Sequence, residues 1–145
     1  MSGISAHSIK RRASELGFDL IVRTDSDQRV LKRGIGEANV PYCAPVQLFN
    51  GVVQELADES PDYLLVPMMR DLPRPGTTLP MSSACPVSQA FPDLVRLNIA
   101  SRLAQRGTKL LTPTIDMGKD NLKSQLFINS IEALARSLGA GRRDW

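Results

Sequence analysis

Two cysteines, Cys43 and Cys85, are the residues of this sequence best suited to chemistry, because a thiolate can bind a metal or take part in redox reactions. Each is followed closely by a proline, Cys43 by Pro45 and Cys85 by Pro86. Proline in the first turn of a helix costs no hydrogen bond, so both cysteines are expected just before a helix begins. The helix dipole and the free N–H groups there favour the thiolate. Thiolates in such a setting suit zinc or an iron–sulfur cluster.

The two cysteines are 42 positions apart and form no short Cys-x-x-Cys motif, so the thiols meet only if the fold brings them together. Three states are compatible with the residues: a shared metal site, two partly buried free thiols, and a redox disulfide. The free thiols are the simplest interpretation and the disulfide is the least favoured, since two cysteines in a cytosolic chain of this size make no disulfide framework. No Ser-His-Asp set or phosphate-binding glycine loop is apparent, and the sole histidine, His7, is expected to be a surface residue.

Short apolar runs mark the candidate strands, at residues 19–22, 38–40, 63–66 and 109–112. Apart from the weak run at 38–40 they are continuous rather than alternating, which is typical of parallel strands covered on both faces. We therefore predict core strands at 19–22, 63–66 and 109–112, with Leu65 buried in the middle of its strand.

Helical periodicity fills the segments between these runs. The predicted apolar stripes are Ala6, Ile9, Ala13 and Leu16; Val30 and Leu31; Phe49, Val52, Val53 and Leu56; Phe91, Leu94, Val95 and Leu103; Phe127, Ile131, Leu134 and Leu138. Asp25 or Ser26 is the expected cap of the second helix, and Gly17, Gly34 and Gly139 are expected to end the first, second and last helices. The alternation of helices and strands predicts a parallel sheet with helices on both faces. Both cysteines would then reach one edge of that sheet and flank a shared crevice.

The segment 68–84 contains three prolines and no periodicity. Loops of this length without secondary structure are usually functional or disordered. This one leaves the carboxyl end of a parallel strand, where α/β sheets bind ligands. We expect it to deliver Cys85 to that edge, or to act as a lid over a small molecule.

Composition limits the class of protein. The 145 residues suffice for one core, and 42% hydrophobic with 23% charged residues is typical of a globular domain. The net charge of +3 is scattered and only 5% of residues are aromatic, so no nucleic-acid interface is predicted. No apolar run approaches the roughly 18 residues of a membrane helix, and no signal peptide is evident, which favours a cytoplasmic protein without membrane contact. Helices without a preceding or following strand stand at both ends, so we expect 1–145 to be a single α/β domain cut from a longer chain.

The two Cys-Pro segments, with the strand between them, resemble a known family. In order they read Cys43-Ala44-Pro45-Val46-Gln47, Asn50-Gly51, Asp62-Tyr63-Leu64-Leu65-Val66-Pro67 and Cys85-Pro86-Val87-Ser88-Gln89, flanked by Leu16-Gly17-Phe18 and Leu111-Thr112-Pro113. This order resembles the uncharacterised CoA-enzyme activase domain of proteins related to the large 2-hydroxyacyl-CoA dehydratase activators. Gln47 stands where that family has lysine and Asn50 where it has histidine, so no charge or proton transfer is implied at these positions.

The resemblance implies a three-layer Rossmann-like α/β domain with a mainly parallel sheet, related to the cluster-binding subunits of these dehydratases. It implies a 4Fe-4S iron–sulfur cluster with Cys43 and Cys85 as metal ligands and with Gly51 and Gln89 at the cofactor. A cluster ordinarily takes about four thiolates, so a missing part of the chain, a second copy or a non-protein ligand would supply the rest. The implied partners are an ATPase domain, of the same or another chain, and a dehydratase subunit.

Two functions follow, and neither makes the isolated domain an enzyme. The first is cluster binding or electron relay in dehydratase activation. The alternative is a structural or docking α/β module with free thiols and no cluster.

Overall fold

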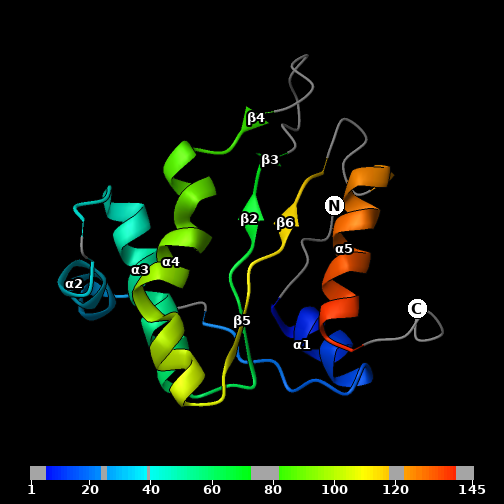
Figure 1. Cartoon of the computed structure of the whole chain (residues 1–145), viewed down its shortest axis with the longest axis horizontal. Helices are drawn as coiled ribbons and strands as arrows, with labels where there is room; N and C mark the ends of the chain where they lie inside the picture. Colours follow the sequence, from blue (N-terminus) through cyan, green and yellow to red (C-terminus); the bar gives the residue numbers. More distant parts are fainter. Residues whose placement is uncertain (1–5, 24–25, 39, 73–81, 118–122, 140–145) are drawn as a thin grey trace. The chain divides into compact units, whose positions relative to one another are not determined.

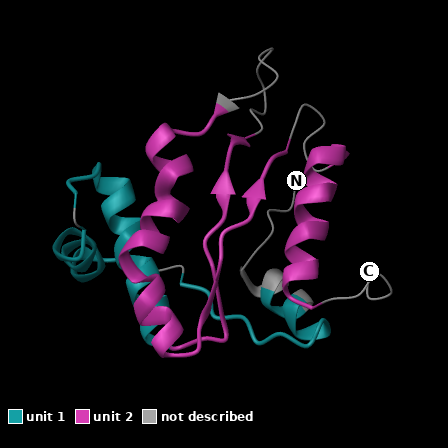
Figure 2. Ribbon diagram, viewed as in Figure 1, with its two compact units in different colours: residues 1–59 teal, residues 60–145 magenta. Residues whose placement is uncertain are grey.

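The structure is a computed structural model that describes residues 6–23, 26–38, 40–72, 82–117 and 123–139. It combines α-helices with short strands, most of them in parallel pairs, and is therefore an α/β protein (Figure 1). Two compact units divide the chain, residues 1–59 and residues 60–145 (Figure 2). None of the described helices is both long enough and apolar enough to cross a membrane.

The first unit contains three helices: α1 (Ala6–Glu15), α2 (Gln28–Gly36) and α3 (Ala44–Asp58). The chain leaves α1 through Gly17, whose φ of 80° lies in the left-handed region that glycine adopts readily. Helix α2 begins after Asp27, whose side chain accepts a hydrogen bond of 2.9 Å from the backbone N–H of Val30. The predicted caps, Asp25 and Ser26, are therefore wrong by one or two positions.

Helices α2 and α3 pack against each other through two glycines. A Cβ atom on Gly34 would lie 1.8 Å from the carbonyl oxygen of Gln47, and one on Gly51 would lie 2.1 Å from the carbonyl oxygen of Val30. Only glycine permits such a close backbone approach. The prediction that Gly34 ends α2 is wrong, because this glycine lies inside the helix and serves its packing on α3.

The buried face of α3 differs from the predicted stripe. Its buried residues are Val46, Asn50, Gly51, Val53, Gln54 and Ala57. Phe49, which the stripe includes, is 44% exposed. The stripe followed the largest apolar side chains, whereas the contact with α2 uses small and polar residues that hydrophobicity does not reveal.

The second unit contains the strands. Strand β1 (Tyr63–Leu65) pairs in parallel with β5 (Lys109–Leu111), and β2 (Met68–Met69) pairs in parallel with β6 (Thr114–Ile115). Hydrogen bonds from Val66 N to Leu111 O (2.9 Å) and from Met68 N to Pro113 O (2.9 Å) continue the pairing between the two ladders. The predicted strands at 63–66 and 109–112 and their parallel orientation are thus confirmed.

Two helices flank these strand pairs, α4 (Pro86–Gln105) and α5 (Gln125–Ser137) (Figure 1). The buried side chains of α4 are Phe91, Pro92, Val95, Ile99 and Leu103, which includes most of the predicted stripe. They join the buried residues Leu64, Val66, Leu111 and Ile115 of the strand segments. Helix α5 is capped by Ser124, whose hydroxyl accepts from Phe127 N at 3.1 Å, and ends at Gly139, where φ is 81°.

Two of the strand predictions are wrong. Residues 19–22 are described and form no strand. They lie in the first unit, whose described residues include no strand with which they could pair. Leu65 is 49% exposed, whereas Leu64 and Val66 are buried. Successive side chains of a strand face opposite sides, so β1 is covered on one face. The run at 38–40 includes residue 39, which lies outside the described residues.

The segment 68–84 contains strands at both ends, contrary to expectation. Strand β3 (Asp71–Leu72) pairs antiparallel with β4 (Ser82–Ser83), and the Ser83 hydroxyl donates to Asp71 Oδ1 at 2.9 Å. Residues 73–81 between them lie outside the described part of the chain. Strand β4 leads directly to Cys85 and α4.

Candidate functional site

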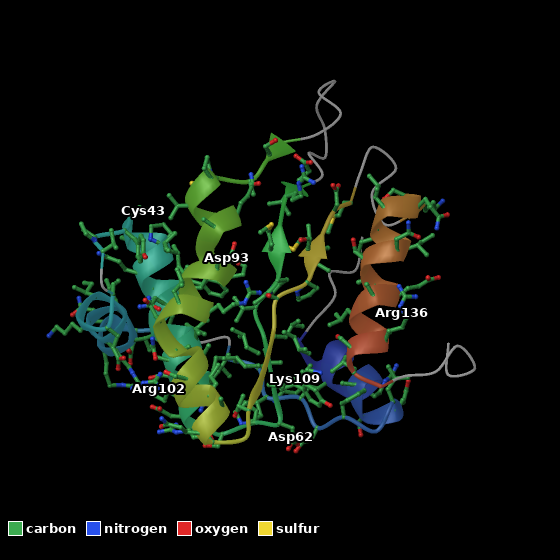
Figure 3. The ribbon with its side chains drawn as sticks, in the orientation of Figure 1. Cys43, Asp62, Asp93, Arg102, Lys109 and Arg136 are labelled. Atoms are coloured by element: carbon green, nitrogen blue, oxygen red, sulfur yellow. The ribbon has the colours of Figure 1, made fainter. Side chains whose placement is uncertain are left out.

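Cys43 is the residue immediately before α3, as its sequence predicts (Figure 3). Its backbone is extended, with φ −62° and ψ 152°, and Pro45 occupies the first turn of the helix. The Cys43 carbonyl oxygen accepts from the backbone N–H groups of Val46 and Gln47, both at 3.0 Å. The thiol is free and exposed. No strand precedes it among residues 40–42, so the predicted strand-to-helix turn is a loop-to-helix turn.

Cys85 occupies the equivalent position before α4, with Pro86 as the first helical residue. Its carbonyl oxygen accepts from Gln89 N at 3.0 Å, and its thiol is also free and exposed. Here a strand, β4, does precede the turn. Exposed thiols beside open helix N-termini are accessible to metal ions and to alkylating reagents.

Gly51 and Gln89, the other two predicted cofactor residues, make contacts within the protein. Gly51 is buried where α3 meets α2. The half-buried side chain of Gln89 donates from Nε2 to the carbonyl oxygen of Ala84 at 2.7 Å. Gly51 therefore serves helix packing, and Gln89 holds the residue that precedes Cys85.

Asn50, where the resemblance noted in the sequence leads us to expect histidine, is 3% exposed. Its Nδ2 donates to the carbonyl oxygen of Gly34 at 3.0 Å. A buried carbonyl that lacked this donor would cost about 1–3 kcal/mol. Asn50 thus belongs to the α2–α3 contact, a role that the sequence alone did not reveal because its partner lies on another helix.

The thiols are suitable ligands for an iron–sulfur cluster in type, since such clusters are held by cysteine thiolates. Within the described residues, however, no group of three or more His, Cys, Asp or Glu side chains could hold a metal ion. Cys43 belongs to the first unit and Cys85 to the second. Their donor set fits part of a cluster's ligand set and does not complete one. The shared crevice expected from the sequence stays a prediction.

Ion pairs, rather than an acidic metal site, occupy the acidic end of α3. Arg29 pairs with Glu55 at 2.5 Å and Arg33 with Asp58 at 2.7 Å. Burial opposes the charge on Arg33, but its hydrogen bond to Asp58 and the nearby carboxylates raise its pKa above the usual value. These carboxylates serve as partners of arginines on α2.

A cavity of about 570 Å³ lies in the second unit, between the segment that includes β5 and β6 and one face of α5. Leu126, Ser130, Ala133 and Ser137 line it from the helix. The hydroxyls of Ser130 and Ser137 donate to carbonyl oxygens of α5 itself, so this wall is mainly apolar. None of the predicted site residues, Cys43, Gly51, Cys85 and Gln89, lines it. The signal that would have found it is the row of small residues at three- and four-residue spacing on α5.

Comparison with known proteins identifies the family. No curated protein and no solved structure matches the chain. Residues 9–145, nearly the whole sequence, match the family described as the CoA enzyme activase uncharacterised domain. The match covers both Cys-Pro helix starts and the strand between them, so the resemblance noted in the sequence is confirmed. The chain belongs to the CoA enzyme activase uncharacterised domain family.

Proposed function

We propose that this domain binds a 4Fe-4S cluster, or relays electrons through one, in a protein that activates a 2-hydroxyacyl-CoA dehydratase. Cys43 and Cys85 are the cluster ligands that this chain supplies. A second copy of the chain or a non-protein group supplies the remaining ligands, and the partners are an ATPase domain, of the same or another chain, and a dehydratase subunit. The proposal places the protein in the cytoplasm, where exposed thiols stay reduced.

The observation that carries the proposal is the repeated setting of the two thiols. Each is exposed, each directly precedes a helix, and each helix has proline in its first turn. Cysteine sulfur is the usual ligand of iron–sulfur clusters, and the exposed position at a helix start leaves both sulfurs accessible to one. Packing alone does not require either cysteine at these positions, because neither side chain is buried.

The proposal includes a finer description of the fold. The parallel pairing of β1 with β5 and of β2 with β6, joined through α4, is the connection expected in a Rossmann-like domain. We propose that the complete domain has three layers and is related to the cluster-binding subunits of the dehydratases.

Iron analysis tests the proposal. The full chain is purified without oxygen, and its iron and acid-labile sulfide are measured per chain. Cys43→Ser and Cys85→Ser remove a thiolate while nearly keeping the size of the side chain. Each should lose most of the iron and sulfide. Ser88→Ala changes the same exposed first turn of α4 without removing a thiol, and it should keep the wild-type content.

Two results would overturn the proposal. One is a wild-type chain that contains no iron or sulfide after anaerobic purification. The other is iron that both cysteine variants retain in full.

A docking module with free thiols is the second candidate, and exposed apolar side chains favour it. Leu97 on α4 is 82% exposed, and Leu126 and Ile128 on α5 are 55% and 41% exposed. Apolar side chains of this kind gain from burial against a partner. A metal-free wild-type chain that binds a partner protein equally well after Cys43→Ser and Cys85→Ser would favour this candidate.

A further inference from the structure

The side chain of Gln89 reaches back over the start of its own helix. Gln89 lies four residues after Cys85, about one helical turn. Helical side chains lean towards the N-terminus, which brings the Gln89 amide within 2.7 Å of the Ala84 carbonyl oxygen. A residue within α4 thereby holds the residue that precedes the Cys85 thiol.

Ala84 is held on both sides. Its backbone N–H donates at 2.8 Å to the carbonyl oxygen of Arg70, the residue that connects strands β2 and β3. Its own carbonyl oxygen accepts from the side chain of Gln89. Pro86 follows Cys85 directly, and its ring fixes its own backbone angle φ. The two chain neighbours of Cys85, Ala84 and Pro86, therefore both have a fixed backbone, while the Cys85 thiol itself is exposed.

Gln47 provides a comparison within the same chain. It also lies four residues after a cysteine, Cys43, at the start of a helix with an early proline. Among the described residues, however, its side-chain amide has no hydrogen-bond partner. The cysteine and the glutamine are four residues apart in both helices, but only in α4 does the glutamine side chain bond to the residue before the cysteine.

We infer that Gln89 is a positioning residue for the Cys85 thiol. Its side-chain amide donates a hydrogen bond to the carbonyl oxygen of Ala84, the residue directly before Cys85. It also joins the first turn of α4 to the residue before Cys85, and this fixes the backbone from which the exposed thiol projects. The inference rests on the proposed function in one respect, that the Cys85 thiolate is the reactive group of the site. It reassigns Gln89 from a cofactor contact to a residue that acts through Cys85.

The test measures the alkylation of each cysteine in the metal-free full chain. Iodoacetamide is added at neutral pH, and mass spectrometry follows the Cys43 and Cys85 peptides in one sample. Gln89→Met keeps the length of the side chain and its neutrality but removes the donor. Gln47→Met makes the same change after Cys43 and is the matched control.

Gln89→Met should slow the alkylation of Cys85 about two- to tenfold, the effect of losing one ordinary hydrogen bond, and should leave the alkylation rate of Cys43 unchanged. Gln47→Met should alter neither rate. Mere loosening of the fold would act in the opposite direction, since a less ordered turn exposes a thiol more. An unchanged or faster Cys85 rate in Gln89→Met overturns the inference, and so does an equal slowing of both cysteines.

The result is separable from the iron analysis because no metal is present. If the wild-type chain contains no iron but Gln89→Met slows the alkylation of Cys85, the cluster proposal is contradicted and the positioning role of Gln89 is supported. If the chain binds iron that depends on Cys85 but the alkylation rate is unchanged in Gln89→Met, the cluster proposal is supported and the positioning role is contradicted.

Discussion

Gly34 and Gly51 bring two helix backbones closer than any other residue type permits. Each glycine faces a carbonyl oxygen of the opposing helix, at distances where a Cβ atom would overlap it. The hydrogen bond from Asn50 to the Gly34 carbonyl oxygen lies beside this contact. The Asn50-Gly51 pair is therefore explained by helix packing, and the same pair forms part of the family resemblance.

Gly51→Ala should destabilise the protein by about 3 kcal/mol, because the new methyl group meets the Val30 backbone and forces the helices apart. Chemical denaturation monitored by circular dichroism measures the change. Gly36→Ala is the matched control, since nothing lies within 4 Å of its Cβ position. It should be neutral or slightly stabilising, because alanine favours a helix over glycine. Equal destabilisation by both substitutions would contradict the packing role of Gly51.

Residues whose role depends on their immediate neighbours could be predicted from the sequence. The prolines after Cys43 and Cys85 located two helix starts, because the preference of proline for the first turn is local. The roles of Asn50 and Gln89 could not be predicted. Asn50 bonds a carbonyl on another helix, and the choice of Ala84 by Gln89 depends on how the turn after β4 is held.

At the scale of elements, β1 is a strand with two different faces. Leu64 is 3% exposed and Leu65 is 49% exposed. The continuous apolar run identified the strand and its parallel pairing with β5, but it could not reveal which side chains were covered. Coverage depends on the helices that pack on each face, and these are distant in sequence.

Leu64→Asp should unfold the protein, whereas Leu65→Asp should be tolerated. A carboxylate buried without a partner costs several kcal/mol, comparable with the stability of a whole domain, about 5–15 kcal/mol. At Leu65 the charge stays hydrated, and the loss should be at most about 1 kcal/mol. Thermal unfolding of the two variants checks the pair. A Leu65→Asp variant as damaged as Leu64→Asp would show that this second face is covered in solution.

The start of helix α2 also depends on packing that the local sequence does not reveal. Asp25, Ser26 and Asp27 are consecutive residues that can all cap a helix. Asp27 is the cap in the structure because it stands three residues before Val30, whose side chain is buried. The N–H of Val30 also lowers the pKa of the Asp27 carboxyl group. The sequence prediction named Asp25 or Ser26 as the cap, and the structure uses the next residue, Asp27, because packing sets where α2 begins.

For the whole molecule, the number of thiols is the decisive quantity. The sequence has two cysteines, and a 4Fe-4S cluster ordinarily takes about four. Composition and motif order were sufficient to predict an α/β chain of this family. They could not predict what would complete the ligand set of the proposed cluster, because two cysteines supply only part of such a set.

A symmetric dimer is the simplest way to complete the four-thiolate ligand set of the proposed cluster. Two copies of the chain supply four cysteines, and most soluble homo-oligomers have closed symmetry, with twofold dimers the commonest. We therefore expect the iron-loaded protein to have twice the 15.9 kDa mass of the chain, and the metal-free protein to have the mass of one chain. Size-exclusion chromatography with light scattering under anaerobic conditions measures both masses. Cys85→Ser should remain at the mass of one chain after the same iron treatment, and Ser88→Ala should behave as the wild type. An iron-loaded protein with the mass of one chain would exclude the second copy, and the missing ligands would then be non-protein groups.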